Sequence, residues 1–205
     1  MAGIEGGDVS PSNIAPLDAI ELANLCESAL PYSKGGQFYG ASDSLSFGTG
    51  LIVDRLAYPV FVPTAGAYGT RAGPALILSH ECDIDPDNIR PFNSNVLVAP
   101  ITKLSSYIDS VKGVYTPEET KSFLLNVAAG KTTRLCFLPR FGDEGGPLYS
   151  GGIVDLNFLA SCGVSALVAS EKVCSLSGFA ITTIDVALQN HLLRPKAEKP
   201  PLPNL

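Results

Sequence analysis

The chain has 205 residues, of which 45% are hydrophobic and 17% charged, and its formal net charge is −6. This balance predicts a folded, rather apolar domain with a sizeable core and excludes a disordered chain. The acidic balance excludes a broad, sequence-independent surface for nucleic acid, which needs clustered Lys and Arg, but it leaves room for a local basic groove.

Five cysteines lie far apart, at positions 26, 82, 136, 162 and 174, and no pair has the CxxC spacing of a zinc knuckle. An odd, scattered set of cysteines indicates a reduced chain rather than a disulfide framework. The N-terminus lacks the charged and apolar regions of a signal peptide, and no run approaches the roughly 18 apolar residues of a membrane span. We therefore expect a cytoplasmic protein with no membrane partner.

The first 50 residues predict one helix. Residues 1–15 are rich in Gly, Ser and Pro and indicate a loose lead-in. Apolar residues recur at helical spacing from Pro16 to Leu30, acidic residues lie near the start of that segment, and Pro31 follows it. Residues 32–50 predict a loop with room for one short edge strand.

The middle of the chain predicts short strands between Gly/Pro-rich turns. Leu51–Val53 and Val60–Val62 are strand candidates, and residues 63–74 predict a long loop of a length that is often functional. The apolar runs Ala75–Leu78 and Val96–Ile101 are bounded by turn residues and predict strands buried on both faces. The densest set of reactive side chains follows the first of these two runs.

The last hundred residues predict two helices and several short strands. Residues 103–115 give no clear pattern, but Thr116 to Glu119 form a capping box with Pro at the first helical position, so a helix over 116–130 is expected. Ser177–Leu193 has the spacing of a final helix, and a Pro-rich tail follows. The expected strands are Thr133–Leu138, Ile153–Leu156, Ala166–Val168 and Val173–Leu176. The whole pattern predicts a β-rich α+β fold, a small bent barrel with about three packed helices.

Two pairs of segments resemble the MazF/PemK toxin family. GTRAGPALILS (69–79), a polar loop and NVLVAPIT (95–102) are similar to that family's loop with arginine and proline, its first apolar strand, and a second strand with a Pro-Ile-Thr-like end. SGGIVDLNFLASCGVSAL (150–167) and EKVCSLSGFAITTIDVALQNHLL (171–193) look like its closing segment with a terminal amphipathic helix. The resemblance covers about half of the chain and implies an SH3-like barrel.

The resemblance also implies a domain division and an activity. Residues 1–45 would be an N-terminal extension with one helix, residues 46–193 the barrel domain with a helical insertion near 116–130, and residues 194–205 a Pro-rich tail. The implied activity is that of a toxin-like endoribonuclease that cleaves single-stranded RNA through the 2′-hydroxyl, without metal or other cofactor. The implied partners are RNA, a cognate antitoxin and a second copy of the chain in a homodimer.

Carried over by position, Arg71 corresponds to the family's catalytic arginine and Thr102 to its catalytic threonine. Cleavage through the 2′-hydroxyl needs groups that neutralise and orient the phosphate while charge develops. Arginine offers a planar pair of donors for this, and a threonine hydroxyl adds one hydrogen bond. In the simpler interpretation, Arg71 is an ordinary loop arginine and Thr102 satisfies backbone groups at a turn.

The segment from Ser79 to Asp85 leaves three interpretations open. His80 is a candidate general acid or base at the phosphate, with Ser79 and Asp83 binding the substrate. In an extended strand, His80 and Cys82 would share a face and could ligate a transition metal together with Asp83 or Asp85. In the simplest interpretation, Cys82 is a small buried hydrophobe, the aspartates form side-chain turns and His80 hydrogen-bonds locally. The Ser-x-x-Cys-Asp-Ile pattern also resembles uncharacterised bacterial and phage proteins of this kind and implies no activity.

The alternative function is a non-catalytic binding module of a phage or mobile-element conflict system, whose acidic surface engages a protein. An open, positive groove that holds Arg71 and Thr102 would favour the enzyme. A site filled by the N-terminal helix or by the helix near 116–130 would favour the module, and zinc bound at His80 and Cys82 would favour metal-dependent chemistry.

Overall fold

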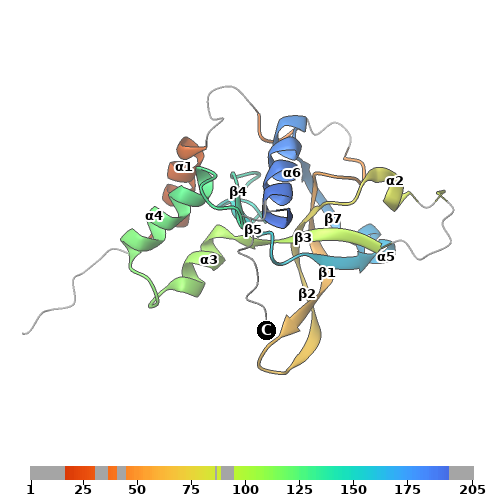
Figure 1. Ribbon diagram of the computed structural model, residues 1–205, viewed down its shortest axis with the longest axis horizontal. Coiled ribbons are helices and arrows are strands. Elements are labelled where there is room, and N and C mark those ends of the chain that lie inside the picture. The colour runs from red at the N-terminus through yellow and green to blue at the C-terminus, as the bar shows by residue number, and fades with distance from the viewer. Residues whose placement is uncertain (1–16, 31–36, 41–44, 86, 89–94, 194–205) are drawn as a thin grey trace, which may run out of the picture.

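The computed structural model describes residues 17–30, 37–40, 45–85, 87–88 and 95–193. Within these ranges the chain is a β-rich α+β protein with seven antiparallel strands and six helices, as the sequence predicted at this coarse level (Figure 1). The strands are β1 (Leu51–Val62), β2 (Ala67–Ile77), β3 (Asn95–Lys103), β4 (Leu135–Leu138), β5 (Gly152–Asp155), β6 (Ala160–Gly163) and β7 (Glu171–Ser175). The helices are α1 (Ala19–Ala29), α2 (Glu81–Ile84), α3 (Leu104–Val111), α4 (Pro117–Ala128), α5 (Val164–Val168) and α6 (Gly178–Leu192).

Strand β3 is the centre of the sheet. One of its edges pairs with β2, whereas the other edge is shared, because the first half of β3 pairs with β6 and the second half with β5. The path through the sheet is β4-β5-β3-β2-β1-β7. Since β6 also contacts β1, the strands curl round an enclosed space rather than lying flat.

The buried side chains form three clusters. The first lies between the outer face of the sheet and α6, and includes Ile52, Leu76, Ala99 and Ile184. The second fills the space enclosed by β1, β2, β3 and β6, and is covered at its ends by α2 and α5; it includes Leu56, Tyr58, Ile77, Val98 and Leu167. The third joins α1, α3 and α4 to β4 and β5, the group at one end of the molecule in Figure 1.

Strands β1 and β2 form a long hairpin that projects beyond the body of the molecule (Figure 1). The prediction of a long loop over residues 63–74 was therefore wrong, since β2 begins at Ala67 and only a short turn precedes it. The β1–β2 register shifts between Val53 and Leu56, and Arg55 at this bulge has a φ of 56°. Pro74 lies opposite the bulge, where its missing N–H costs no ladder hydrogen bond.

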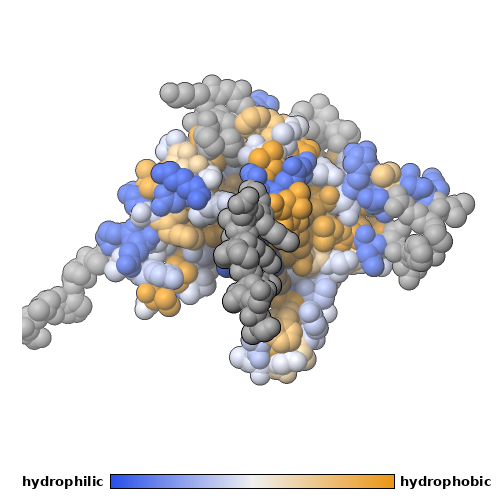
Figure 2. All heavy atoms as spheres, in the orientation of Figure 1, coloured by the Kyte–Doolittle hydropathy of each residue, from blue (hydrophilic) through white to orange (hydrophobic). Residues whose placement is uncertain are grey.

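The end of the hairpin exposes two aromatic rings. Phe61 is 50% exposed and Tyr68 is 78% exposed, and their ring centroids are 5.5 Å apart. Figure 2 shows apolar surface at this end of the hairpin and beside α6.

The three helices expected from the sequence are confirmed as α1, α4 and α6. The capping box is present, with the Thr116 hydroxyl accepting from the Glu119 N–H at 3.2 Å. The prediction of a strand over Ala166–Val168 was wrong, because those residues end helix α5, and residues 104–111 form α3 where no pattern was clear. The expected lead-in (1–15) and tail (194–205) lie outside the described residues. None of the helices in the described ranges is long and apolar enough to cross a bilayer.

Candidate functional site

Arg71 and Thr102 lie on either side of the point where β2 and β3 part. The last pair of their ladder at this end is Ala75 with Pro100. Beyond it, β2 continues beside β1 alone, and β3 turns to pair with β5, where Thr102 is opposite Ile153. Arg71 is thus a strand residue, whereas the sequence predicted a loop at this position. Both Arg71 and Thr102 are exposed.

The two side chains also share one face of the sheet. Paired residues in an antiparallel ladder point to the same side, and successive residues alternate. Arg71 precedes Ala75 by an even number of residues and Thr102 follows Pro100 by an even number. Ile101, between Pro100 and Thr102, packs on the opposite face with α6, which agrees with this alternation. Arg71 and Thr102 therefore both point away from the α6 face, on strands that part beyond the pair Ala75 and Pro100, and Thr102 shares its side with its partner Ile153, which packs in the third cluster.

Tyr58 adds a hydroxyl group to this opening. It is the direct partner of Arg71 in the β1–β2 ladder and is 4% exposed. Its hydroxyl lies 3.6 Å from the point where a Cβ on Gly73 would stand, an ordinary contact distance, so the phenol reaches the backbone two residues along β2 from Arg71. Burial raises the pKa of Tyr58, and the positive charge of Arg71 offsets this only in part. The phenol therefore stays protonated at neutral pH and can donate a hydrogen bond.

Arg71 keeps its charge available to an anion. Among the described residues it forms no ion pair, whereas Arg55 is bound to Glu171 at 2.6 Å and Arg134 to Asp155 at 2.5 Å. Lys103, half-buried, follows Thr102 directly and, by the same alternation, has the register of the opposite face. A guanidinium and hydroxyl groups are the kinds of donor that bind phosphate in proteins.

Ser79, His80 and Asp83 lie at the other end of β2. Arg71 and Ile77 are six residues apart in one strand, so about 20 Å of strand separates Arg71 from this segment. The Ser79 hydroxyl accepts the N–H of Leu97 at 2.8 Å and closes the far end of the β2–β3 pair. These three residues and Arg71 therefore do not meet at a single phosphate.

The metal interpretation needed an extended strand at His80, and the structure has helix α2 there instead. His80 caps that helix, its Nδ1 accepting from the Cys82 N–H at 3.4 Å, so the expected local hydrogen bond is confirmed. Asp85 likewise accepts from the Asp87 N–H at 2.9 Å, as expected for a side-chain turn. Cys82 is exposed and not buried, which corrects the simplest interpretation. The described ranges contain no group of three or more His, Cys, Asp or Glu side chains placed to hold a metal ion.

The sequence did not predict a polar network near the end of α6, formed by Arg134, Asp155, Asn157 and His191. Arg134 binds Asp155 through two hydrogen bonds of 2.8 and 2.5 Å, and His191 Nε2 lies 2.6 Å from the Asn157 side-chain oxygen. Burial alone would raise the pKa of Asp155, but hydrogen bonds from Arg134 and the Asn157 N–H, and the charge of Arg134, hold it below its usual value. The network fastens α6 to β4 and β5. Its arginine is already paired, so it offers no charge to a substrate.

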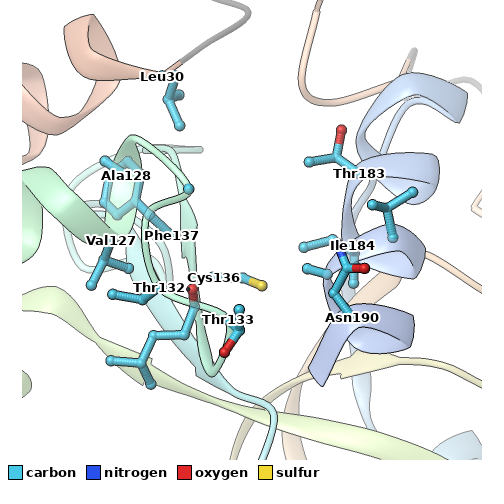
Figure 3. A pocket seen from close by; sticks show the side chains of 14 residues that line it. Leu30, Val127, Ala128, Thr132, Thr133, Cys136, Phe137, Thr183, Ile184 and Asn190 are labelled. Carbon is cyan, nitrogen blue, oxygen red and sulfur yellow. Dashed lines mark hydrogen bonds between the residues drawn. The ribbon is translucent and has the colours of Figure 1, made fainter. Parts of the chain in front are cut away.

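A cavity of about 210 Å³ separates α6 from α4 and β4 (Figure 3). Thr183, Ile184 and Asn190 face it from α6, and Val127 and Phe137 face it from the other wall. None of the described residues that line it is charged, and neither Arg71 nor Thr102 is among them. The Cys136 thiol in its wall has its pKa raised to about 11 by burial, so it is no nucleophile at neutral pH. The cavity therefore lacks the groups that phosphate chemistry requires.

Comparison of the chain with models of protein families and with curated proteins gave no match. The motifs in the sequence and the geometry at the β2–β3 opening are therefore the features that bear on function.

Proposed function

We propose that the protein is an endoribonuclease with an SH3-like barrel of the MazF/PemK kind, and that it cleaves single-stranded RNA at the β2–β3 opening. The observation that carries this proposal is the exposed Arg71, which forms no ion pair with any described residue, on the same side of the sheet as the exposed Thr102 and opposite the protonated phenol of Tyr58 in the β1–β2 ladder. The curled strands β1, β2, β3, β6 and β7, followed by a terminal helix, support the barrel assignment.

The proposed reaction needs few groups. The 2′-oxygen of the RNA attacks phosphorus, the bond from phosphorus to the 5′-oxygen breaks, and a 2′,3′-cyclic phosphate forms. The 2′-hydroxyl gives its proton to solvent, and the leaving 5′-oxygen takes up one. Arg71 would neutralise the phosphate as charge builds up, while the hydroxyls of Thr102 and Tyr58 donate hydrogen bonds to its oxygens. His80 has no part here, because it lies at the far end of β2.

The helices that were candidates for blocking the site pack on Ile153, the ladder partner of Thr102, without covering Thr102 itself. Helices α1 and α4 cover β4 and β5, where they contact Phe137 and Ile153, and they leave Thr102 exposed. This arrangement favours the enzyme over the module in which a helix fills the site.

A non-catalytic binding module remains the alternative function because the projecting end of the β1–β2 hairpin exposes aromatic residues. Phe61 and Tyr68 expose their rings there, and exposed aromatic residues are typical anchors of protein interfaces. An antitoxin or a second copy of the chain, as the family resemblance implies, would be a suitable partner for this surface.

The test is cleavage of a long, mixed-sequence RNA by the purified protein, with and without EDTA. We expect cleavage that survives EDTA and leaves 2′,3′-cyclic phosphate ends. Arg71→Ala should lower the rate about 10²- to 10³-fold, the usual cost of removing one donor to a developing oxyanion. Lys121→Ala, which removes an exposed positive charge from α4, should leave the rate unchanged.

Two results would contradict the proposal. Equal cleavage by the wild type and Arg71→Ala would mean that the activity belongs to another site or a contaminant. No cleavage by the folded wild type would overturn the enzyme and leave the binding module as the better account.

A further inference from the structure

Strand β4 ends the path through the sheet, and one of its edges has no neighbouring strand among the described residues. In an antiparallel ladder, pairs that exchange hydrogen bonds alternate with pairs whose backbone groups point away from each other. The Leu156 N–H donates to the Arg134 carbonyl at 2.8 Å, one pair beyond the β4–β5 ladder. Cys136 is therefore bonded to β5, whereas Leu135 and Phe137 turn their N–H and C=O groups to the free edge.

Most of these outward groups lack a hydrogen bond. The Leu135 carbonyl accepts the Thr132 hydroxyl at 3.1 Å, but the Leu135 N–H and both backbone groups of Phe137 have no partner among the described residues. Phe137 is 4% exposed, so little water reaches its backbone. Buried N–H and C=O groups are almost always paired in folded proteins. The edge therefore needs a partner that the described part of the chain does not supply.

The cavity of about 210 Å³ between α4 and α6 runs along this edge (Figure 3). Leu135, Cys136 and Phe137 all line it, although Phe137 packs in the third cluster with α4 and Cys136 packs against the first cluster with α6. A space that touches both faces of one strand lies at the edge of that strand. Thr132, whose hydroxyl meets the outward Leu135 carbonyl, also lines the cavity. The outward groups of β4 therefore point to this space.

The walls of the cavity are aliphatic and uncharged. Val127 and Ala128 come from α4, and Ile184 and Ala187 come from α6. No described lining residue is charged, so an ion would lose its hydration here without gaining a counter-charge. Apolar walls with a few placed backbone groups are the usual composition of a small-molecule site. Val186 at the cavity is 50% exposed, which leaves a way in from solvent.

The size of the cavity limits the ligand to about one ring. A cavity of about 150 Å³ holds a benzene molecule. The cavity at β4, of about 210 Å³, therefore has room for a ring with a few small substituents. It is too small for a peptide strand of several residues.

We propose that this cavity binds a small, uncharged, single-ring heterocycle with a hydrogen-bond donor beside an acceptor, the chemistry of a pyrimidine base. The N–H and C=O of one extended residue point the same way, so the donor of the ring would meet the Phe137 carbonyl and its acceptor the Phe137 N–H. The ring itself would lie between the aliphatic walls from α4 and α6. The proposal is independent of the site at Arg71 and Thr102, since neither residue lines the cavity.

The test is titration of the full chain with cytosine at pH 7, followed by calorimetry and by NMR of the backbone amides. We expect saturable binding with a Kd of about 1 mM or tighter, and a downfield shift of the Phe137 amide proton as it forms a hydrogen bond. The matched control is 4-methylpyrimidin-2-one, in which a methyl group replaces the amino group. It should bind at least about tenfold more weakly, because the Phe137 carbonyl then stays unpaired.

Two variants fill the cavity from α6. Ala187→Phe adds a ring inside it, and Thr183→Leu adds a smaller apolar side chain. Each should weaken cytosine binding by at least about tenfold, since the added atoms occupy the space of the ligand. Gln189→Phe adds the same ring at an exposed position on α6 that does not line the cavity, and should bind cytosine as the wild type does. Thermal unfolding shows which variants are folded; if both cavity variants unfold, the shift of the Phe137 amide in the wild type decides.

Several outcomes would overturn the proposal. No saturable binding of cytosine up to about 20 mM would mean that water alone serves the edge of β4. Equal binding of cytosine and its methyl analogue would mean that the backbone groups of Phe137 do not select the ligand. Binding that neither folded cavity variant weakens, or that leaves the Phe137 amide unshifted, would place the ligand elsewhere on the protein.

Discussion

At the scale of single residues, Tyr58 is the group whose role the register of β1 and β2 reveals. It is buried, lies opposite Arg71 in the ladder, and its hydroxyl comes close to Gly73, two residues along β2 from Arg71. If it donates a hydrogen bond to the phosphate, Tyr58→Phe should slow RNA cleavage by up to about 100-fold. The ring remains, so stability should change by less than about 1 kcal/mol.

The matched control for this change is Tyr39→Phe. The Tyr39 hydroxyl donates to the Pro139 carbonyl at 2.5 Å, a contact that serves the fold alone. Its loss should lower the free energy of unfolding by about 1 kcal/mol and leave the cleavage rate unaltered. A Tyr58→Phe protein that cleaves RNA as fast as the wild type would remove Tyr58 from the proposed site.

Asp155 should contribute stability that depends on pH. Because Arg134 and the Asn157 N–H hold its pKa below the usual 3.8 in the folded state, this contribution is fully present above about pH 4 and is lost as the pH falls through the lower, folded-state pKa. At pH 7, Asp155→Asn should lower the free energy of unfolding by about 1 kcal/mol, as expected for a partly exposed, two-bonded pair.

Urea unfolding at pH 7 and pH 3 checks this expectation. The difference between wild type and Asp155→Asn should shrink at the lower pH. Asp109→Asn, which changes an exposed carboxylate outside the pair, should show no such trend. A difference that stays constant between the two pH values would show that the ion pair does not stabilise the fold.

At the scale of elements, the capping box makes α4 the helix whose start is best defined by its own sequence. Thr116→Ala removes the hydroxyl that accepts from the Glu119 N–H and should lower the free energy of unfolding by about 1 kcal/mol, or the midpoint of thermal unfolding by about 2–4 °C. Ser122→Ala, at an exposed position within α4, should change stability by less than about 0.5 kcal/mol. Equal effects of the two changes would contradict the role of the cap.

The same scale shows where sequence reasoning succeeded and where it failed. Helix α4 was predicted because its cap, its proline and its apolar face lie within one short segment. The β1–β2 hairpin was not predicted because the glycines and prolines of residues 63–74 are typical of a loop. Pro74 fits in strand β2 because it faces the bulge in β1, and a bulge in another strand cannot be predicted from the residues around Pro74. A short apolar run such as Ala166–Val168 suits either a strand or a helix, and only its neighbours decide.

Some residues of the candidate site could be predicted from the sequence and others could not. Arg71 and Thr102 could be named from motifs, since each belongs to a recognisable local sequence. Tyr58 could not, because its place beside Arg71 depends on the register of two strands. The separation of His80 from Arg71 likewise required the observation that β2 is one continuous strand between them.

At the scale of the whole molecule, charge and apolar surface are unevenly divided. The net charge is −6, yet Arg71 stands unpaired at the β2–β3 opening among the described residues, and the end of the hairpin is apolar. An RNA strand would therefore be attracted locally and repelled by the rest of the surface. Such a distribution favours short, specific contacts over general affinity for nucleic acid.

The five cysteines report on the stability of the whole fold. All five are thiols within the described residues, and Cys82 is the exposed one among them. Burial raises the pKa of Cys174 to about 12, and burial with the nearby charge of Glu27 raises that of Cys26 to about 11. A chromogenic disulfide reagent at pH 8 should therefore modify one thiol quickly in the native protein and the other four only as the chain unfolds, because the thiolate is the reactive form.

Cys82→Ser identifies the fast thiol. In that variant the rapid phase should disappear, while the slow phase should keep the rate of global unfolding measured by circular dichroism. The Cys136 thiol is the most informative of the slow group, since it lines the cavity beneath α6 and is only half-buried. If the Cys136 thiol reacts before the other three slow thiols, α6 separates from β4 without global unfolding. The third cluster and α6 would then not form one cooperative unit with the sheet. A single slow phase for all four would show that they do.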